Sequence, residues 1–393
     1  MKKIKIGIIT CHRVPNYGSF LQAWSLSHYL QEEGYKVEII DYIYPNLYHF
    51  RKVYNKEDGG EKQIKSIKDK FHRYIVDRWY RASSKRGIEF FVYSFFAKYI
   101  FHNPTKNFFL ELPLSRKTYH NNIQIKKAAN NYDILIVGSD QIWNPRFSGY
   151  DSTFFLQFGG TNVKRIAYSA SFGVIKLPEQ YKDNYKKWLS TFSSIATREE
   201  TGTKIVKELL GKPGIHVLDP VMLFSAQQWE AIIPQSNQNQ PYILSYCLDY
   251  IYKVYPFVDK IFEDISLKLN LHKVSLYKST LADCTIFNNL HPFEFVRFIK
   301  NASFILVTSF HGLAYSILFH VPFLVIYPQE PINDSRIYDL LETFELSNRI
   351  VKIGETVSNN QLEDIDWDKV DKIYNKILNT SKKYLFEAIN NKK

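Results

Sequence analysis

Short runs of apolar residues alternate with longer segments of helical periodicity along most of the chain. Residues 5–10 form an apolar run, and residues 20–33 place Leu21, Trp24, Leu26 and Leu30 near helical spacing. A second short apolar run follows at 37–40, and the same rhythm resumes at 133–137. Such alternation predicts strand–helix–strand units, and therefore parallel sheets that helices cover on both faces.

The rest of the chain continues this pattern. Further strands are predicted at 165–169, 194–197, 216–218, 242–246, 273–276, 304–307 and 323–327, and further helices at 252–270, 292–300 and 367–389. Because 393 residues exceed the usual size of a single core, we expect two domains. A polar, turn-rich stretch near 234–240 predicts a first domain at 1–234 and a second at 241–350. The helix within 365–393 is expected to return to the first domain.

The alternation is interrupted at residues 51–127, which carry 18 Lys and Arg against 7 Asp and Glu. This insertion therefore holds almost all of the net charge of +12. Residues 64–79 place apolar side chains on one helical face, and 89–101 are aromatic almost all round. Two interpretations stay open: a helical subdomain that packs its aromatics internally or against a second subunit, and a surface for an anionic membrane. Nucleic acid is not expected, since no binding motif accompanies the charge.

Cysteine usage and hydropathy indicate the compartment. Cys11, Cys247 and Cys284 form no C-x-x-C motif and have no neighbouring histidine cluster at metal-ligand spacing, so neither a structural disulfide nor a metal site is expected. The N-terminal apolar run is too short for a signal peptide, and no stretch approaches the roughly 18 apolar residues of a membrane-spanning helix. We therefore expect a cytoplasmic protein, with peripheral contact at the inner membrane face as the alternative that the insertion leaves open.

Polar residues follow the predicted strand at 304–307. Ser309, His311 and Gly312 lie where this strand leads into a helical pattern that starts at Leu313. In parallel α/β sheets this edge is the usual ligand crevice, and the first amides of a helix favour an anion. His311 is thus placed to meet a phosphate or a carboxylate, although a histidine that only caps or packs the turn is an equal alternative.

Two other strand ends carry candidate chemistry. The strand at 133–137 leads into Asp140, Gln141, Trp143 and Asn144, a polar and aromatic group that resembles a sugar site, with simple turn chemistry as the alternative. Arg198 follows 194–197 and is positioned to clamp a carboxylate, or else to pair with a neighbouring glutamate. The loop at 12–19 lacks G-x-G-x-x-G, which argues against a dinucleotide site.

Several of these segments together carry a resemblance to a known family. They are Gly7-Ile8-Ile9-Thr10, Asn16-Tyr17-Gly18-Ser19-Phe20-Leu21-Gln22-Ala23, Val137-Gly138-Ser139-Asp140-Gln141-Ile142-Trp143-Asn144, Tyr168-Ser169-Ala170-Ser171-Phe172-Gly173, Arg198-Glu199, Val217-Leu218-Asp219-Pro220 and Ser309-Phe310-His311-Gly312. With them the chain resembles the polysaccharide pyruvyl transferase family. The resemblance implies an α/β fold of two Rossmann-like domains, similar to the GT-B glycosyltransferases, with the active site in the cleft between the domains.

The same resemblance implies transfer of pyruvate from phosphoenolpyruvate, a co-substrate, onto a sugar as a ketal, without a cofactor. His311 is the expected acid, Arg198 the carboxylate ligand and Asp140 the base toward the sugar hydroxyl. The expected donor site consists of Arg198, Ser309, His311, Gly312 and Ser171, and the expected acceptor site of Asn16, Tyr17, Gln22, Gln141, Trp143 and Asn144. Some relatives carry arginine where this chain has Ser309, which leaves Arg165 or Arg13 as substitutes.

The sequence leaves other functions open. A nucleotide-sugar glycosyltransferase on the same architecture would use the turn at 309–312 for a diphosphate. A non-catalytic glycan-binding protein would need neither His311 nor a donor site. The sugar acceptor itself is either a polysaccharide or a precursor linked to a polyprenyl diphosphate.

Overall fold

The computed structural model of the protein describes residues 3–14, 16–43, 108–119, 122–146, 151–160, 162–235, 240–249, 252–330 and 332–391. The amphipathic and aromatic segments predicted at 64–79 and 89–101 lie outside these residues. The chain forms two compact units. The first contains residues 1–172, 178–195 and 388–393, and the second contains residues 173–177 and 196–387.

These limits differ from those that the polar stretch near 234–240 indicates, since residues 196–234 are counted with the second unit. Contacts inside that unit explain the difference. The Tyr374 hydroxyl donates a hydrogen bond of 3.0 Å to the carbonyl of Met222, and the indole of Trp229 packs edge-on against Tyr315 at 5.2 Å between ring centroids.

A seven-stranded sheet contains the first run of alternating elements, in the order β3-β2-β1-β4-β5-β6-β7. Its strands are β1 (Lys5–Ile9), β2 (Lys36–Tyr42), β3 (Leu114–Tyr119), β4 (Ile134–Val137), β5 (Lys164–Ala170), β6 (Ser194–Thr197) and β7 (Ile215–His216). The central strand β1 is parallel to both neighbours, with Ile6 opposite Val37 on one side and Ile134 on the other. All four residues of β4 are buried, as the apolar runs predict for a sheet covered on both faces.

Strand β3 corrects one prediction. The helical insertion expected over 51–127 is wrong near its end, because Leu114–Tyr119 forms an edge strand parallel to β2. Arg116 and Lys117 are exposed on this strand, where charged side chains discourage pairing with another chain. The basic residues that made this segment look unlike a buried strand are thus explained by its position at the edge of the sheet.

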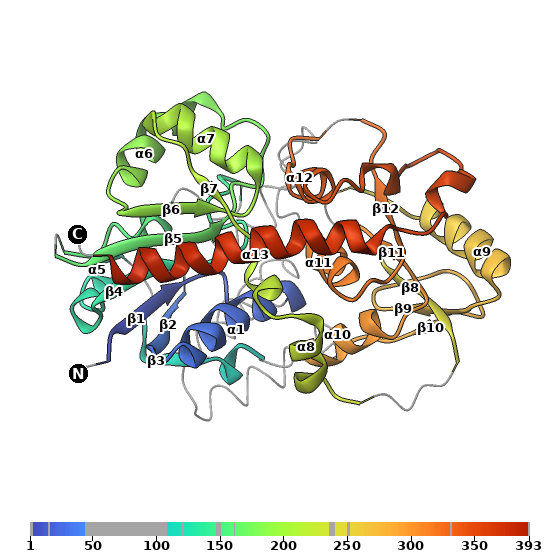
Figure 1. Ribbon diagram of the computed structural model, residues 1–393, viewed down its shortest axis with the longest axis horizontal. Coiled ribbons are helices and arrows are strands. Elements are labelled where there is room, and N and C mark those ends of the chain that lie inside the picture. The colour runs from blue at the N-terminus through green and yellow to red at the C-terminus, as the bar shows by residue number, and fades with distance from the viewer. Residues whose placement is uncertain are drawn as a thin grey trace, which may run out of the picture. The chain divides into compact units, whose positions relative to one another are not determined.

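Helices cover the first sheet on both faces, with α1 (Tyr17–Glu32) on one side and α6 (Glu179–Leu189) on the other (Figure 1). α1 begins three residues before the predicted start, because the Asn16 side chain accepts a hydrogen bond of 2.8 Å from the amide of Gly18 and caps the helix. Shorter elements of this unit are α5 (Asn122–Ile125), η2 (Phe108–Glu111), η3 (Ala129–Asn131) and η4 (Ser152–Phe155).

A six-stranded sheet forms the centre of the second unit, in the order β10-β9-β8-β11-β12-β13. Its strands are β8 (Tyr242–Tyr246), β9 (His272–Ser275), β10 (Thr285–Ile286), β11 (Phe304–Val307), β12 (Phe323–Tyr327) and β13 (Ile350–Lys352). Strands β8, β11 and β12 have the bounds that their apolar runs predict, and every residue in them is buried. Both sheets are parallel and Rossmann-like, as expected.

The helices of the second unit are α7 (Glu200–Leu210), α8 (Ala226–Ile232), α9 (Phe257–Leu269), α10 (Pro292–Lys300), α11 (Phe310–Leu318), α12 (Arg336–Thr343) and α13 (Trp367–Asn390), with η5 (Pro220–Leu223), η6 (Ser347–Arg349) and η7 (Asn359–Gln361) between them. Phe262 of α9 shares a buried cluster with Ile243 and Leu306. Phe295 of α10 packs against Tyr246, which points to the opposite face of β8 from Ile243.

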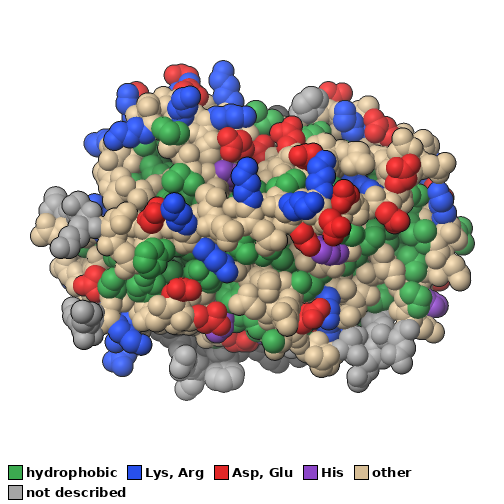
Figure 2. All heavy atoms as spheres, in the orientation of Figure 1, with side chains coloured by type: hydrophobic (Ala, Val, Ile, Leu, Met, Phe, Trp, Pro, Cys, Tyr) green, Lys and Arg blue, Asp and Glu red, His purple; other side chains and the backbone are tan. Residues whose placement is uncertain are grey.

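Helix α13 is 24 residues long, and its last residues belong to the first unit, where the Lys164 ammonium donates to the carbonyl of Asn391 at 2.6 Å. None of the helices within the described ranges combines the length and the apolar character needed to cross a bilayer. Figure 2 shows Lys and Arg side chains interspersed with Asp and Glu on the visible face, which agrees with the location of the excess positive charge in the insertion.

Candidate functional site

Each sheet reverses its strand order at one point, between β1 and β4 in the first and between β8 and β11 in the second. Ligands of parallel α/β sheets bind outside the carboxyl ends of the strands at such a point. In the second unit, Thr308 joins the two loops that leave this point. Its hydroxyl accepts from the amide of Leu248 at 2.8 Å and donates to the carbonyl of the same residue at 3.1 Å.

Helix α11 begins at Phe310 and not at Leu313, so His311 and Gly312 lie in its first turn. Ser309 is the N-cap, and its hydroxyl accepts from the amide of Gly312 at 3.4 Å. Glycine is required here, because a Cβ atom at this position would lie 2.7 Å from Cγ2 of Val307. The close approach of helix and strand places His311 at the carboxyl end of β11.

Arg198 and His311 meet at a shared carboxylate, that of Asp219. Nη1 of Arg198 donates to Oδ2 of Asp219 at 3.1 Å, and Nε2 of His311 lies 3.6 Å from the same oxygen, an ion pair when the ring is protonated. The Arg198 and Asp219 side chains are 1% and 0% exposed, and the His311 side chain is 9% exposed. The two residues expected to bind the donor therefore lie together, in the second unit.

The Arg198 guanidinium is only partly satisfied. Within the described part of the chain, its Nε and Nη2 atoms are buried without a hydrogen-bond partner, and one face stacks on the Phe310 ring with Cζ 4.0 Å from the centroid. A buried unsatisfied donor costs about 1–3 kcal/mol, and more on a charged group. Nε and Nη2 form one edge of the guanidinium fork, the geometry that binds a carboxylate through both oxygens.

His216 contacts the backbone of Arg198. Its Nε2 atom lies 3.1 Å from the Arg198 carbonyl oxygen, and its Nδ1 atom lies 3.8 Å from Glu200. Burial lowers the pKa of His216 below its ordinary value, against the opposing charge of Glu200. The neutral ring then donates one hydrogen bond, to the carbonyl, and this bond fixes the start of the loop that carries Arg198.

The sequence alone does not identify two residues of this cluster, Asp219 and Tyr315, as parts of the site. Asp219 stands in the matched segment Val217-Leu218-Asp219-Pro220, but nothing local indicates that it serves both Arg198 and His311. Tyr315 follows His311 by four residues on α11, so the helical period puts both on one face. Burial and the nearby charge of Asp219 raise the pKa of the Tyr315 hydroxyl well above its ordinary value. This hydroxyl has no hydrogen-bond partner among the residues that the structure describes.

Asp140 organises the carboxyl end of β4 in the first unit. Its Oδ2 accepts from the Ser19 hydroxyl at 2.7 Å, and its Oδ1 accepts from the amide of Gln141 at 2.8 Å. Its backbone is left-handed at φ 73°, and Ser169 at the end of β5 is left-handed at φ 55°. Such residues cost roughly 1–3 kcal/mol and cluster at functional sites. Burial, with the charge of Asp140, raises the pKa of the nearby Cys11 thiol well above its ordinary value.

Trp143 and Gln22 do not offer the surfaces expected of an acceptor site. Both are 0% exposed. The Trp143 indole donates to the carbonyl of Phe154 at 3.0 Å and stacks on Phe155 at 5.6 Å between centroids. Gln22 donates to the Thr10 hydroxyl and to the carbonyl of Ser19, each at 2.9 Å. In this structure both side chains are buried and bonded inside the first unit.

The remaining expected residues also lie in the first unit. Asn16, Tyr17 and Gln141 are half-buried near the start of α1 and the end of β4, and Asn144 is buried and donates to Gln141 at 2.8 Å. Ser171 is 0% exposed, and its backbone bonds to that of Asp140 and Trp143. Ser171 thus lies with the expected acceptor residues, and the structure brings only Arg198, Ser309, His311 and Gly312 of the expected donor set together in the second unit.

The two arginines considered as substitutes at Ser309 are engaged elsewhere. Arg13 binds Asp41 through two hydrogen bonds of 2.6 Å, with His12 on the same carboxylate at 3.0 Å. Burial alone would raise the pKa of Asp41, but the hydrogen bonds and charges of His12 and Arg13 hold it well below its usual range. Arg165 donates to the carbonyl of Leu156 at 3.0 Å and to those of Gly159 and Gly160.

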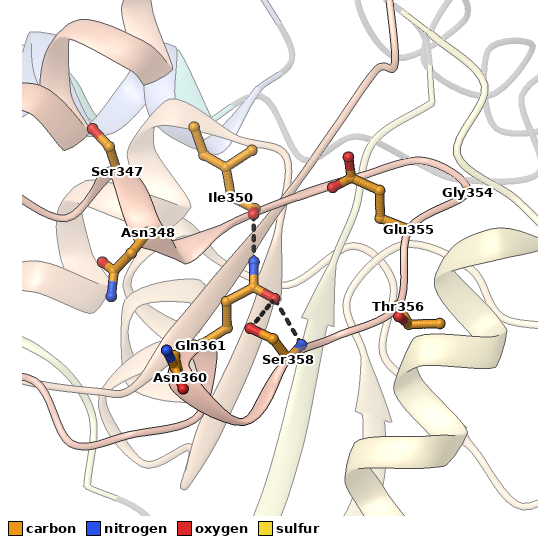
Figure 3. A pocket seen from close by; sticks show the side chains of 9 residues that line it. All are labelled: Ser347, Asn348, Ile350, Gly354, Glu355, Thr356, Ser358, Asn360 and Gln361. Carbon is orange, nitrogen blue, oxygen red and sulfur yellow. Dashed lines mark hydrogen bonds between the residues drawn. The ribbon is translucent and has the colours of Figure 1, made fainter.

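The described residues around Arg198 and Asp140 contain no set of metal ligands, and the pocket in Figure 3 lies elsewhere. Among the described residues, no three His, Cys, Asp or Glu side chains are grouped as a metal site requires. The pocket, of about 720 Å³, lies beside the edge strand β13. The Gln361 amide in its centre is already bonded to the carbonyl of Ile350 and to Ser358, and none of the lining residues belongs to the clusters around Arg198 or Asp140.

Comparison with known proteins identifies the family. The sequence model of the family described as polysaccharide pyruvyl transferase matches residues 16–330. The chain belongs to the polysaccharide pyruvyl transferase family. The matched residues of this pyruvyl transferase family member include Asp140, Arg198, Asp219 and His311. No curated protein sequence matches the chain.

Solved structures show the fold. A Listeria monocytogenes protein assigned as a UDP-N-acetylglucosamine 2-epimerase is similar with 11% identity and a TM-score of 0.50, covering 99% of this chain and 96% of the other. The Methanocaldococcus jannaschii UDP-GlcNAc 2-epimerase has 14% identity and a TM-score of 0.47, covering 96% and 93%. The glycosyltransferase SnogD from Streptomyces nogalater has 13% identity and a TM-score of 0.49, covering 98% and 100%. The two parallel sheets and the similarity to the Listeria monocytogenes structure confirm the expected α/β fold of GT-B type.

Proposed function

We propose that this member of the family transfers the pyruvyl group of phosphoenolpyruvate to two hydroxyls of a sugar and forms a cyclic ketal. Membership supports a transferase that acts in polysaccharide biosynthesis. The observation that carries the finer proposal is the unsatisfied edge of the buried Arg198 guanidinium, whose Nη1 atom binds the same carboxylate as His311. A buried charged fork gains most from a ligand with a carboxylate, and phosphoenolpyruvate supplies one together with a phosphate.

The reaction begins at the double bond of the donor. In the proposed mechanism the His311 imidazolium gives a proton to the methylene carbon, and the adjacent carbon becomes a cation that one sugar hydroxyl attacks. The bond from this carbon to the phosphate oxygen then breaks, phosphate leaves, and a second hydroxyl of the same sugar closes the ring. Asp140 takes the proton of the attacking hydroxyl and passes it to solvent, from which His311 regains a proton, and the proton of the second hydroxyl leaves with the phosphate.

The donor phosphate is proposed to bind at the start of α11. Ser309 offers a hydroxyl there, and the first amides of the helix carry the positive end of its dipole. Since the Arg198 and Asp219 charges cancel, these donors and a protonated His311 supply the positive potential that the anion needs.

Asp140 is the proposed base toward the acceptor hydroxyl, with Asn16, Tyr17, Gln141 and Asn144 as acceptor ligands. Its carboxylate is half-buried and held by Ser19, which leaves lone pairs for a further hydroxyl. Trp143 and Gln22 are not included, because both are fully buried. The proposed acceptor is a sugar of a polysaccharide or of its lipid-linked precursor.

A lipid-linked acceptor would lie at a membrane. Sedimentation with anionic vesicles at low and high salt tests whether the insertion at 51–127 binds such a membrane.

The decisive experiment measures release of inorganic phosphate from phosphoenolpyruvate in the presence of candidate sugars, with mass spectrometry of the sugar product. A product heavier by one pyruvyl ketal supports the proposal, and the His311→Ala variant should lose roughly 10² to 10⁴ in rate. Thermal protection separates the alternatives. Protection by nucleotide sugars and not by phosphoenolpyruvate would show a glycosyltransferase, and full function of His311→Ala would show a non-catalytic glycan-binding protein.

A further inference from the structure

A second polar cluster lies at the carboxyl edge of the second sheet, after strands β8 and β9. Asp249 follows β8 by three residues, and Tyr277 and Lys278 follow β9. The Tyr277 hydroxyl donates to Oδ1 of Asp249 at 2.6 Å, and the Lys278 ammonium pairs with Oδ2. The hydrogen bonds and charge of Lys278 and Tyr277 lower the pKa of Asp249 although burial opposes this, so the carboxylate is ionised at neutral pH.

This cluster is held by rigid elements but open to solvent. The Tyr255 hydroxyl donates to the carbonyl of Lys278 at 2.8 Å, and the Lys278 ammonium lies over the Tyr255 ring, 4.5 Å from its centroid. Ser275, the last residue of β9, donates to the same carbonyl at 3.0 Å. The side chains of Lys278 and Asp249 nevertheless remain 45% and 22% exposed. Both side chains are therefore accessible to a ligand.

Charge and hydrogen-bonding capacity define what such a cluster binds. The lysine and the aspartate cancel each other's charge, so a free anion gains little and would meet the carboxylate. The ammonium has three donors and the carboxylate about four acceptor positions, of which the contacts above use only part. Two neighbouring hydroxyls of one pyranose ring match this pair, one accepting from the ammonium and the other donating to the carboxylate.

We propose that Asp249 and Lys278 form a subsite for a vicinal diol of a sugar ring. Strands β9, β8 and β11 are consecutive in the sheet, so the ends of β8 and β9 that lead into the cluster lie about one and two strand spacings, or about 5 and 10 Å, from the end of β11 that leads into α11. The Thr308 hydroxyl also ties Leu248, the neighbour of Asp249, to the loop that leads into α11. That the bound ring belongs to the acceptor rests on the proposed function, whereas the binding of a sugar does not.

Saturation-transfer NMR with the methyl glycosides of galactose, glucose and mannose, in the absence of phosphoenolpyruvate, tests the subsite. We expect saturation of at least one glycoside by the full chain, and at least about tenfold weaker binding for Asp249→Asn and Lys278→Met. Lys369→Met is the matched control, because it breaks an exposed ion pair of 2.6 Å with Glu345 in the same unit. Tyr277→Phe keeps the ion pair but removes the hydroxyl that orients Asp249. Its glycoside binding should be weaker than that of the wild type and stronger than that of Asp249→Asn.

Absence of saturation for all three glycosides, or equal saturation in the wild type and both variants, would overturn the subsite. A loss in the control variant as large as in the other two would also overturn it, because the effect would then not be local. Thermal protection by phosphoenolpyruvate is measured on the same samples. Glycoside binding without protection by phosphoenolpyruvate would overturn the proposed function and support the subsite. Protection without glycoside binding would support the proposed function and overturn the subsite.

Discussion

Replacement of Arg198 by lysine tests the donor site most directly. Lysine keeps the positive charge next to Asp219 but lacks the planar Nε–Nη2 edge that the structure leaves unsatisfied. Each hydrogen bond to a charged group contributes about 1.5–3 kcal/mol. Loss of two such bonds to the carboxylate of phosphoenolpyruvate should therefore weaken its binding by about 3–6 kcal/mol, or by a factor of roughly 10² to 10⁴.

Isothermal titration calorimetry with phosphoenolpyruvate, at fixed ionic strength and without an acceptor, measures this difference. Arg349→Lys is the matched control, because Arg349 is buried in the second unit as Arg198 is, at 2% exposed against 4%. Its guanidinium donates to the carbonyls of Gln361 and Glu363, each at 2.6 Å. This control should lower the thermal stability without changing the affinity for phosphoenolpyruvate.

The two variants separate binding from folding. An Arg198→Lys protein that unfolds at the wild-type temperature and binds phosphoenolpyruvate with the wild-type Kd would refute the assignment of this guanidinium to the donor carboxylate. Equal loss of affinity in Arg198→Lys and Arg349→Lys would refute it as well, because the loss would then follow from any buried arginine.

Three further substitutions test the surroundings of the two clusters. Tyr315→Phe removes a buried hydroxyl without a partner in the described structure and should stabilise the protein by about 1 kcal/mol, whereas a lower midpoint of urea unfolding would contradict that reading. Gly312→Ala places a Cβ 2.7 Å from Val307 and should destabilise by roughly 1–3 kcal/mol in the same assay. Asp41→Asn leaves Arg13 buried without its carboxylate and should cost about 3–5 kcal/mol at pH 7. The pKa of Asp41 is lower in the folded state than in the unfolded state. The contribution of Asp41 to the free energy of unfolding is therefore complete above about pH 4 and is lost as the pH falls through the folded-state pKa. The stabilities of the wild type and Asp41→Asn should thus become equal in acid.

Local pattern was sufficient for most of the elements. Strands β8, β11 and β12 and helix α10 have the predicted bounds, because a continuous apolar run or a helical period is written in neighbouring residues. The placement of chemistry after a strand followed from the same reasoning, since in a parallel sheet all carboxyl ends share one edge. The sequence alone therefore places His311 and Asp140 at the carboxyl edges of their sheets.

Tertiary contacts decided the rest. The basic edge strand β3 depends on β2 for its hydrogen bonds, and no periodicity within Leu114–Tyr119 announces that partner. Its polar neighbours in the sequence predict that Trp143 stacks on a sugar ring. In the structure Phe155 and Phe192, the latter about 50 positions away, pack against its indole instead. Asp219 became the link between Arg198 and His311 only when segments more than 90 residues apart folded together. Elements follow from short-range sequence, whereas the pairing of charges follows from long-range packing, which no local window contains.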